Sequence, residues 1–296
     1  MFLFLFRIIQ FFFLIILFKK IFKKILKVIK KIIINFNLFI LFRKYNGKNK
    51  KDKRLKICFI TSLISNKFSE FIDYPKGKKF DNFDFKIICD KNVNFDGWDT
   101  IYISKKELAK HADINETYPL SEIYMSRYAK FMIWEYFEKN KIKYDYIVYC
   151  DSYLYPKETI NWDYFIEDYL KNNDIIQTLH NVSCLSDCNG VVKFKKDTEE
   201  NILKLKEYLN ERNYDLNSKN YYENTILIYN TNNDNLKKTL SEFWKIYTKE
   251  KLTYRDQPLW NYVCEKNNIR RPRLPYKSLF EYFFYKNQSK CHIYHK

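Results

Sequence analysis

Short apolar runs alternate with longer amphipathic stretches between residues 55 and 265. The runs are rich in β-branched and aromatic side chains, and they predict strands at 55–62, 83–89, 100–103, 146–150, 175–179 and 225–229. Apolar residues at helical spacing predict helices at 121–140, with Ser121 as N-cap, and at 197–209, 236–248 and 256–265. This alternation indicates an α/β layered domain with a mostly parallel sheet.

The uncharged run at 146–150 predicts a strand that is covered on both faces. It ends at Asp151 and Ser152. Open α/β sheets bind ligands beyond the carboxyl ends of their strands, so Asp151 is a candidate to hold a divalent metal or a sugar nucleotide. The alternative is that Asp151 only starts a turn or caps the next segment.

Residues 1–44 differ from the rest in pattern and charge. Residues 2–18 are apolar except for Arg7 and Gln10, residues 19–31 alternate lysine pairs with apolar residues, and residues 32–42 form a second apolar run. Residues 1–56 carry 16 of the 53 basic residues and one of the 35 acidic ones. This composition predicts a membrane-associated helical segment that contacts anionic lipid, in which either residues 2–18 form a short uncleaved anchor or the whole segment lies in the interface. The alternative, a helix packed on the body, would bury many lysines.

The lysines next to the first apolar run also predict on which side of the membrane the body lies. The lysines follow the first apolar run, so the positive-inside rule predicts a cytoplasmic body. No small-residue cleavage site follows that run, so we expect no removable signal peptide. Residues 45–54 are charged and contain Gly47, which predicts a linker to a domain at 55–296.

Composition narrows the possible functions. The chain is 46% hydrophobic and 19% aromatic, which allows a sizeable core. Beyond residue 56 there are 37 basic and 34 acidic residues, so the body has no large charge excess to attract nucleic acid. No glycine-rich phosphate loop is present, which argues against a kinase-like or dinucleotide-binding mechanism. Cys58, Cys89 and Cys150 lie within or at the ends of apolar runs and are expected to be reduced core residues.

Other metal-ligating residue types are scattered. His180, Cys184 and Cys188 could contribute to a zinc site, but the usual paired spacing of four ligands is absent, so we favour unligated residues. His292 and His295 lie at the end of the chain, where residues are usually frayed.

Arg127 and Lys130 are three residues apart on the helix predicted at 121–140, which places them near one another. They are candidates to bind an anionic substrate. The alternative is that they belong to a solvated helix face.

Four short motifs stand in order along the chain: Ser-Arg-Tyr-Ala-Lys at 126–130, Tyr-Asp-Tyr-Ile-Val-Tyr-Cys-Asp at 144–151, Tyr-Glu-Asn-Thr at 222–225 and Arg-Asp-Gln at 255–257. Together they resemble the glycosyltransferase-like family that includes the plant TOD and MUCI proteins, formerly a domain of unknown function. The resemblance covers roughly residues 55–270. It implies a GT-A-like, Rossmann-type layered fold.

The resemblance also implies roles for individual residues. Asp151 would hold a divalent metal, Mn²⁺ or Mg²⁺, and the catalytic residues would be Asp256 and Glu223. The substrate would contact Arg127, Lys130, Asn224, Gln257 and Ser152. The sequence departs from the pattern at Tyr153, where GT-A enzymes carry a second Asp or the family a short polar residue. One carboxylate makes a weaker metal site than two.

These observations predict a membrane-attached glycosyltransferase that moves a sugar from a nucleotide-sugar donor to a glycan or glycolipid acceptor. The alternative is a non-catalytic α/β binding module tethered to a membrane. A hydrolase acting on a lipid amide has less support, because no pair of nucleophile and base can be picked out.

Overall fold

The computed structural model describes Phe22, Ile25 and residues 55–64, 83–92, 98–118, 120–157 and 159–285, without the side chains of the last two residues. The chain divides into two units, Met1–Asn46 and Gly47–Lys296, and the account below concerns the second. The predicted linker, most of the predicted membrane segment, His292 and His295 lie outside the described residues. Within the described part, no helix is long and apolar enough to cross a membrane.

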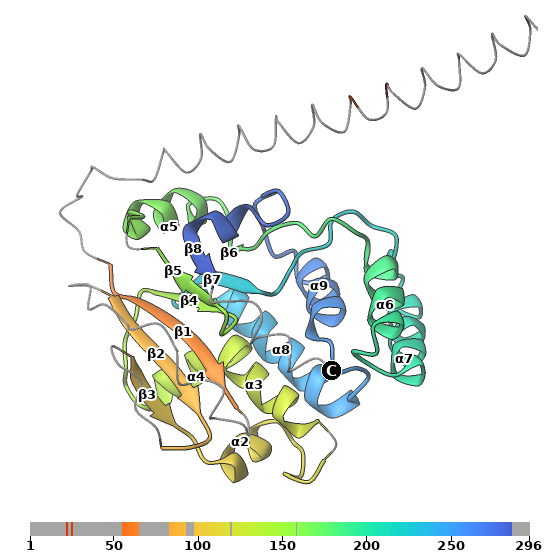
Figure 1. The fold of residues 1–296 in the computed structure, drawn as a ribbon, viewed down its shortest axis with the longest axis horizontal. Helices are drawn as coiled ribbons and strands as arrows, with labels where there is room; N and C mark the ends of the chain where they lie inside the picture. Colours follow the sequence, from red (N-terminus) through yellow and green to blue (C-terminus); the bar gives the residue numbers. More distant parts are fainter. Residues whose placement is uncertain are drawn as a thin grey trace, which may run out of the picture. The chain divides into compact units, whose positions relative to one another are not determined.

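Within the described residues a six-stranded sheet forms the centre of the second unit (Figure 1). It contains β1 (Ile57–Leu63), β2 (Phe83–Cys89), β3 (Asp99–Tyr102), β4 (Tyr146–Cys150), β6 (Ile175–Ile176) and β7 (Ile226–Asn230), in the order β3-β2-β1-β4-β7-β6. The pairs β1–β2, β2–β3 and β1–β4 are parallel, whereas β7 is antiparallel to both of its neighbours. The prediction of an α/β domain with a mostly parallel sheet is therefore confirmed.

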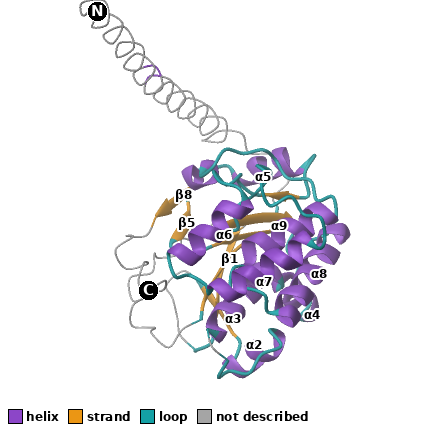
Figure 2. Ribbon diagram, turned by 90° about the vertical axis from the view of Figure 1, so that its right-hand side faces the viewer, coloured by secondary structure: helices purple, strands orange, loops and turns teal. Residues whose placement is uncertain are grey.

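The described residues also form eight α-helices. They are α2 (Lys105–His111), α3 (Ser121–Phe131), α4 (Ile133–Lys139), α5 (Trp162–Leu170), α6 (Cys184–Lys193), α7 (Glu199–Asn210), α8 (Asp234–Glu250) and α9 (Asp256–Lys266). A short 3-10 helix, η2 (Ser278–Tyr282), precedes β8 (Phe283–Tyr285), and β8 pairs with β5 (Leu154–Pro156) in a separate two-stranded sheet (Figure 2).

The sheet is covered on both faces. Alternate strand residues such as Ile60 and Tyr149 belong to a large buried cluster that also holds residues of α2, α3, α4, α8 and α9. On the other face Phe59 packs edge-on against Trp162 of α5, and Phe85 stacks on Tyr155 of β5. Cys58, Cys89 and Cys150 are fully buried in the strands, as predicted.

Two predicted elements differ from the structure. The helix predicted at 121–140 is interrupted at Met132, whose φ of −122° separates α3 from α4. Ser121 is the first residue of α3 rather than its N-cap: Leu120 holds the cap position, and the Ser121 hydroxyl donates to the Glu116 carbonyl oxygen. The strand predicted at 175–179 is only two residues long, because the chain beyond Ile176 pairs through isolated bridges instead.

Candidate functional site

The site lies where the strand order reverses, between β1 and β4, at the carboxyl ends of the parallel strands. Asp151 directly follows β4, and its backbone N–H donates to the Thr225 carbonyl oxygen over 3.0 Å. Because β7 runs antiparallel to β4, the residues that precede β7 lie at this same edge. The antiparallel direction of β7 thus brings Glu223 and Asn224 to the carboxyl end of β4, where Asp151 lies.

Two basic and two acidic side chains form a charge network at this edge: Arg127, Lys130, Asp151 and Asp256. The Lys130 ammonium lies 3.4 Å from Oδ1 of Asp151 and 3.4 Å from Oδ2 of Asp256. Arg127 Nε donates to Oδ1 of Asp256 over 3.1 Å. Only 3% of the Lys130 side chain and 4% of the Asp256 side chain are exposed, whereas 30% of Asp151 is exposed. A solvated helix face is therefore the wrong interpretation for Lys130.

Local structure explains how each member is held. Arg127 and Lys130 are one turn apart on α3, and Asp256 is the first residue of α9, where the helix dipole favours a carboxylate. The Tyr149 hydroxyl donates to Oδ1 of Asp151 over 3.1 Å, and its ring centroid lies 5.1 Å from the Lys130 nitrogen. The carbonyl oxygen of Asp151 accepts a turn hydrogen bond from the Leu154 N–H, so Asp151 also starts a turn.

The network keeps Asp256 ionised. Burial opposes the charge of this carboxylate, but the neighbouring positive charges of Lys130 and Arg127 outweigh burial, and the pKa of Asp256 lies well below its usual value. Asn224 Nδ2 adds a hydrogen bond of 3.0 Å to Oδ2 of Asp256. The network as a whole holds two positive and two negative charges, so it is neutral.

Glu223 lies beside the network in a different electrostatic environment. Burial raises the pKa of Glu223 to about 7, and this rise outweighs the hydrogen bond of 3.2 Å that Oε2 accepts from the Thr178 hydroxyl. The side-chain amide of Gln177 donates to the Glu223 carbonyl oxygen and to Oδ1 of Asn224, both over 2.9 Å. The indole N–H of Trp260 in turn donates to Gln177 Oε1 over 3.2 Å. The Gln177 contacts orient Asn224 and hold the Glu223 backbone from within the core.

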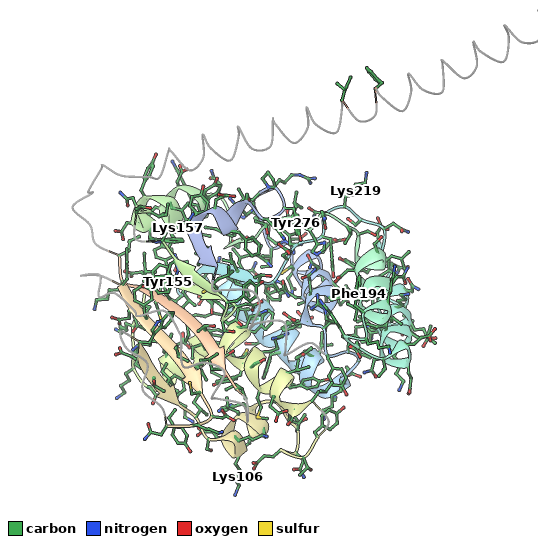
Figure 3. The ribbon with its side chains drawn as sticks, viewed as in Figure 1. Lys106, Tyr155, Lys157, Phe194, Lys219 and Tyr276 are labelled. Carbon is green, nitrogen blue, oxygen red and sulfur yellow. The ribbon has the colours of Figure 1, made fainter. Side chains whose placement is uncertain are left out.

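Beyond the carboxyl ends of the parallel strands, residues 178–180 pair with residues 221–223 and with Leu274 through backbone hydrogen bonds. Leu179 N–H donates to the Leu274 carbonyl oxygen over 2.8 Å, His180 N–H to Tyr221 over 2.7 Å, and Glu223 N–H to Thr178 over 2.9 Å. This alignment sets the His180 ring 5.4 Å from the ring of Tyr276, a residue of the segment between α9 and η2 that is labelled in Figure 3. Burial lowers the pKa of His180, so its imidazole is neutral at pH 7.

Tyr149, Gln177, Thr178 and Tyr276 were not expected in the site. Tyr149 belongs to the predicted buried strand, where a tyrosine is indistinguishable from a core aromatic. Gln177 and Thr178 could have been noticed as two polar residues at the end of an otherwise apolar run. Nothing in the sequence around Tyr276 sets it apart from the other 25 tyrosines.

The remaining predicted residues, Gln257 and Ser152, lie at the margin of the charge network. Gln257 is buried on α9 and points its amide to Asp187, with 3.5 Å between Gln257 Nε2 and Asp187 Oδ2. The same carboxylate accepts a hydrogen bond of 2.8 Å from the Tyr221 hydroxyl and lies 3.8 Å from Arg255. Ser152 is half-buried next to Asp151. The structure thus gathers Arg127, Lys130, Asn224, Asp151 and Asp256 in direct contact, and leaves Glu223, Gln257 and Ser152 around them.

The donor set does not fit a metal ion held by the protein alone. Within the described residues, no group of three or more His, Cys, Asp or Glu side chains is placed to bind one. At Asp151 the neighbouring cation is the Lys130 ammonium, which already contacts Oδ1. Cys184 and Cys188 are buried in α6, and Nδ1 of His180 accepts a hydrogen bond from the Val182 N–H.

A cavity of about 440 Å³ opens at the opposite edge of the sheet. Its walls include Tyr146 at the start of β4, Asn230 at the end of β7, and Glu167 and Lys171 from the region of α5. Because β4 separates this cavity from Asp151, it is no part of the candidate site.

No protein-family model and no curated protein matches the sequence. Three of the solved structures that the chain resembles in fold are glycosyltransferases. The apo structure of the bifunctional glycosyltransferase WbbM is 17% identical, with a TM-score of 0.45, and covers 78% of this chain. Core-mannan synthase A from Aspergillus fumigatus, in its Mn/GDP form, is 11% identical over 74% of this chain and 72% of its own, with a TM-score of 0.40. Mouse xyloside xylosyltransferase 1, apo form, is 11% identical over 79% and 94%, also with a TM-score of 0.40. This chain spans 40% of the WbbM structure.

Proposed function

We propose that this protein is a glycosyltransferase of the TOD and MUCI type with a GT-A-like fold, which moves a sugar from a nucleotide-sugar donor to a glycan or glycolipid acceptor. One observation carries the proposal. Each of the four sequence motifs contributes a side chain to a single contact cluster: Arg127 and Lys130, Asp151, Asn224, and Asp256. The cluster lies at the switch point of the sheet, where open α/β folds bind ligands.

The residues around the neutral network suit an anionic donor. Transfer from a nucleotide sugar leaves negative charge on a diphosphate, and positioned cations stabilise it. Arg255 lies next to Asp256, and its Nε is buried without a hydrogen-bond partner among the described residues. Lys277 is exposed and close enough to Glu223 to influence its pKa. In this proposal Arg255 and Lys277 bind the diphosphate, while Arg127 and Lys130 shape the floor below it.

Glu223 is the group best suited to move a proton. A general base works best when its pKa is near the working pH, and the pKa of Glu223 is raised to about 7. It would accept the proton of the acceptor hydroxyl, with the rings of His180 and Tyr276 beside the acceptor sugar. Asp256 stays ionised and enclosed, so we assign it the role of positioning Arg127, Lys130 and Asn224 rather than of exchanging protons.

The sequence supports two further parts of the proposal. Residues 1–44 would attach the protein to a membrane through lysines and apolar side chains, and the body would be cytoplasmic. A divalent metal, if the reaction uses one, would arrive with the donor and take its other ligands from the phosphates, because Asp151 offers one carboxylate.

A screen of donors tests the proposal. The unfolding temperature is measured with UDP-glucose, UDP-galactose, UDP-N-acetylglucosamine and GDP-mannose, each with and without MnCl₂, and nucleotide release is then followed with the donor that binds. We expect one donor to stabilise the protein, and Asp151→Ala to reduce nucleotide release at least a hundredfold while the unfolding temperature changes by a few degrees.

Two results would contradict the proposal. Full nucleotide release by Asp151→Ala would remove Asp151 from the site. Absence of any shift at millimolar concentrations of all four donors would favour the alternative function, a tethered binding module.

A further inference from the structure

The Lys130 ammonium has the surroundings of a bound cation. Its nitrogen lies 3.4 Å from an oxygen of each of two carboxylates, Asp151 and Asp256, which are 105 positions apart in the sequence. Hard metal ions are held in proteins by carboxylate oxygens in this bridging manner. From this geometry we infer that Lys130 takes the place of a divalent cation at the edge of the sheet, so that the protein itself holds no metal ion there.

The surrounding groups point both carboxylates at the ammonium. The Tyr149 hydroxyl contacts the same oxygen of Asp151 as Lys130 does, which fixes the orientation of that carboxylate. Arg127 and Asn224 contact the two oxygens of Asp256 over 3.1 and 3.0 Å. The face of the Tyr149 ring lies 5.1 Å from the nitrogen and adds a further favourable contact for a cation.

Burial prevents a metal ion from replacing the Lys130 ammonium between the two carboxylates. Only 3% of the Lys130 side chain is exposed, so the ammonium is not a solvated charge that a metal ion could displace by exchange with water. Removing a buried cation from two carboxylates would leave their charges uncompensated, at a cost that a weakly bound metal could not offset.

The same arrangement accounts for Tyr153. With Arg127 and Lys130 opposite Asp151 and Asp256, the charges cancel. A second acidic residue two positions after Asp151 would add a negative charge without a cation to balance it. A chain that uses a lysine as its cation has no need of that second carboxylate.

The placement of Lys130 is tested without any substrate. Binding of Mn²⁺ alone to the full-length protein is measured by electron paramagnetic resonance of the free ion and by titration calorimetry. We expect the parent to bind Mn²⁺ at this edge too weakly to detect, and Lys130→Met to bind it at least tenfold more tightly, because the oxygens of Asp151 and Asp256 that face the ammonium can then face the ion. Mn²⁺ should raise the unfolding temperature of Lys130→Met and leave that of the parent unchanged.

Matched variants make the result specific. Lys266→Met removes a lysine from the same helix as Asp256, 50% exposed and far along α9, and should bind no more Mn²⁺ than the parent. Adding Asp151→Asn to Lys130→Met should abolish the gained binding. If Lys130→Met does not fold, Lys130→Gln replaces it, because the amide can still donate hydrogen bonds to both carboxylates.

The outcomes separate this inference from the proposed function. Tight Mn²⁺ binding by the parent that Asp151→Asn abolishes, or no gain of binding in either Lys130 variant, would overturn the inference. The inference relies on the proposed function only for what the cation does. If Lys130→Met gains Mn²⁺ but no nucleotide sugar binds the parent, the placement of Lys130 stands and the glycosyltransferase proposal fails.

Discussion

The candidate site contains two buried carboxylates, Asp256 and Glu223, and their neighbours give them opposite properties. Asp256 is 2% exposed and faces Lys130 and Arg127, which hold its pKa below the usual value. Glu223 is 9% exposed, and although its carboxyl accepts a hydrogen bond from the Thr178 hydroxyl, burial dominates and raises its pKa to about 7. The site therefore contains a permanently charged acid and one that titrates near neutrality.

Glu223→Gln is expected to change how stability depends on pH. The folded protein binds the Glu223 proton more tightly than the unfolded chain does, so the parent loses stability as pH rises from about 4.5 to about 7. The variant has no such proton to lose. By pH 8 it should be more stable than the parent by up to about 3 kcal/mol relative to their difference at pH 4. Urea unfolding at pH 4, 6 and 8 measures this.

Glu265→Gln provides the control, because Glu265 is exposed on α9 and carries the same chemical change. Parallel stability curves for the parent and Glu223→Gln would contradict the assignment of a raised pKa. A flat curve for the difference between Glu265→Gln and the parent is expected.

Asp256→Asn should destabilise the protein more than an ordinary substitution. The change removes one of two carboxylates that compensate the buried Lys130, and it removes the ion pair with Arg127. Breaking a buried pair from one side costs about 3–5 kcal/mol. The cost should shrink as pH falls below about 4, because Asp256 then binds a proton in the unfolded parent but, with its lowered pKa, not in the folded protein. A loss below about 1 kcal/mol at pH 7 in urea unfolding would show that the network contributes little.

At the scale of elements, the apolar pattern predicts the buried strands β2 and β4 correctly. β2 and β4 have the predicted bounds, because uncharged β-branched runs determine where buried strands begin and end. The pattern does not show the interruption at Met132, since apolar residues recur at helical spacing on both sides of it. It also misses α2, α5 and α6, as well as the short strands β5 and β8, whose pairing joins residues 127 to 131 positions apart.

The sequence predicts only those contacts of the site that depend on local spacing. Helical spacing shows that Arg127 and Lys130 are neighbours, because that relation is local. Their partner Asp256 is 129 and 126 residues away, and no local pattern specifies such a contact. The four motifs indicated the right residues through resemblance, while the pairing of charges among them is visible only in three dimensions.

Helix α6 contains a glycine whose replacement should stabilise the protein. Gly190 lies inside α6, and a Cβ built on it would meet no heavy atom within 4 Å. Alanine loses less backbone entropy on folding than glycine does, so Gly190→Ala should raise the free energy of unfolding by about 0.5–1 kcal/mol. Urea unfolding of the parent and the variant measures the change. A destabilised Gly190→Ala would mean that α6 packs more tightly than the structure shows.

On the scale of the whole molecule, the charge network depends on the complete sheet. Its members come from α3, the end of β4 and the start of α9, while Asn224 precedes β7. None of these segments can position its side chains alone, and the network exists only when β4 and β7 are paired. Activity should therefore be lost in the same transition as the fold.

Removal of residues 1–43 should leave this transition intact. The first contact that the structure describes for the body comes from the Leu55 N–H, which donates to Asp163 of α5. We expect the shortened protein to be soluble, to unfold at a temperature close to that of the full chain, and to lose binding to vesicles that contain anionic lipid. Recovery only as aggregate would show that the body needs the segment for its fold.

The shared charges of Lys130 have a consequence for how the sequence can change over evolutionary time. A mutation that removes Asp256 leaves Lys130 and Arg127 with one carboxylate between them, and a mutation that removes Lys130 leaves two acids facing each other. Each single variant is expected to be less stable than the starting protein, so positions 130 and 256 are expected to change together. Descendants of this protein should carry paired exchanges at 130 and 256, and single exchanges should be purged.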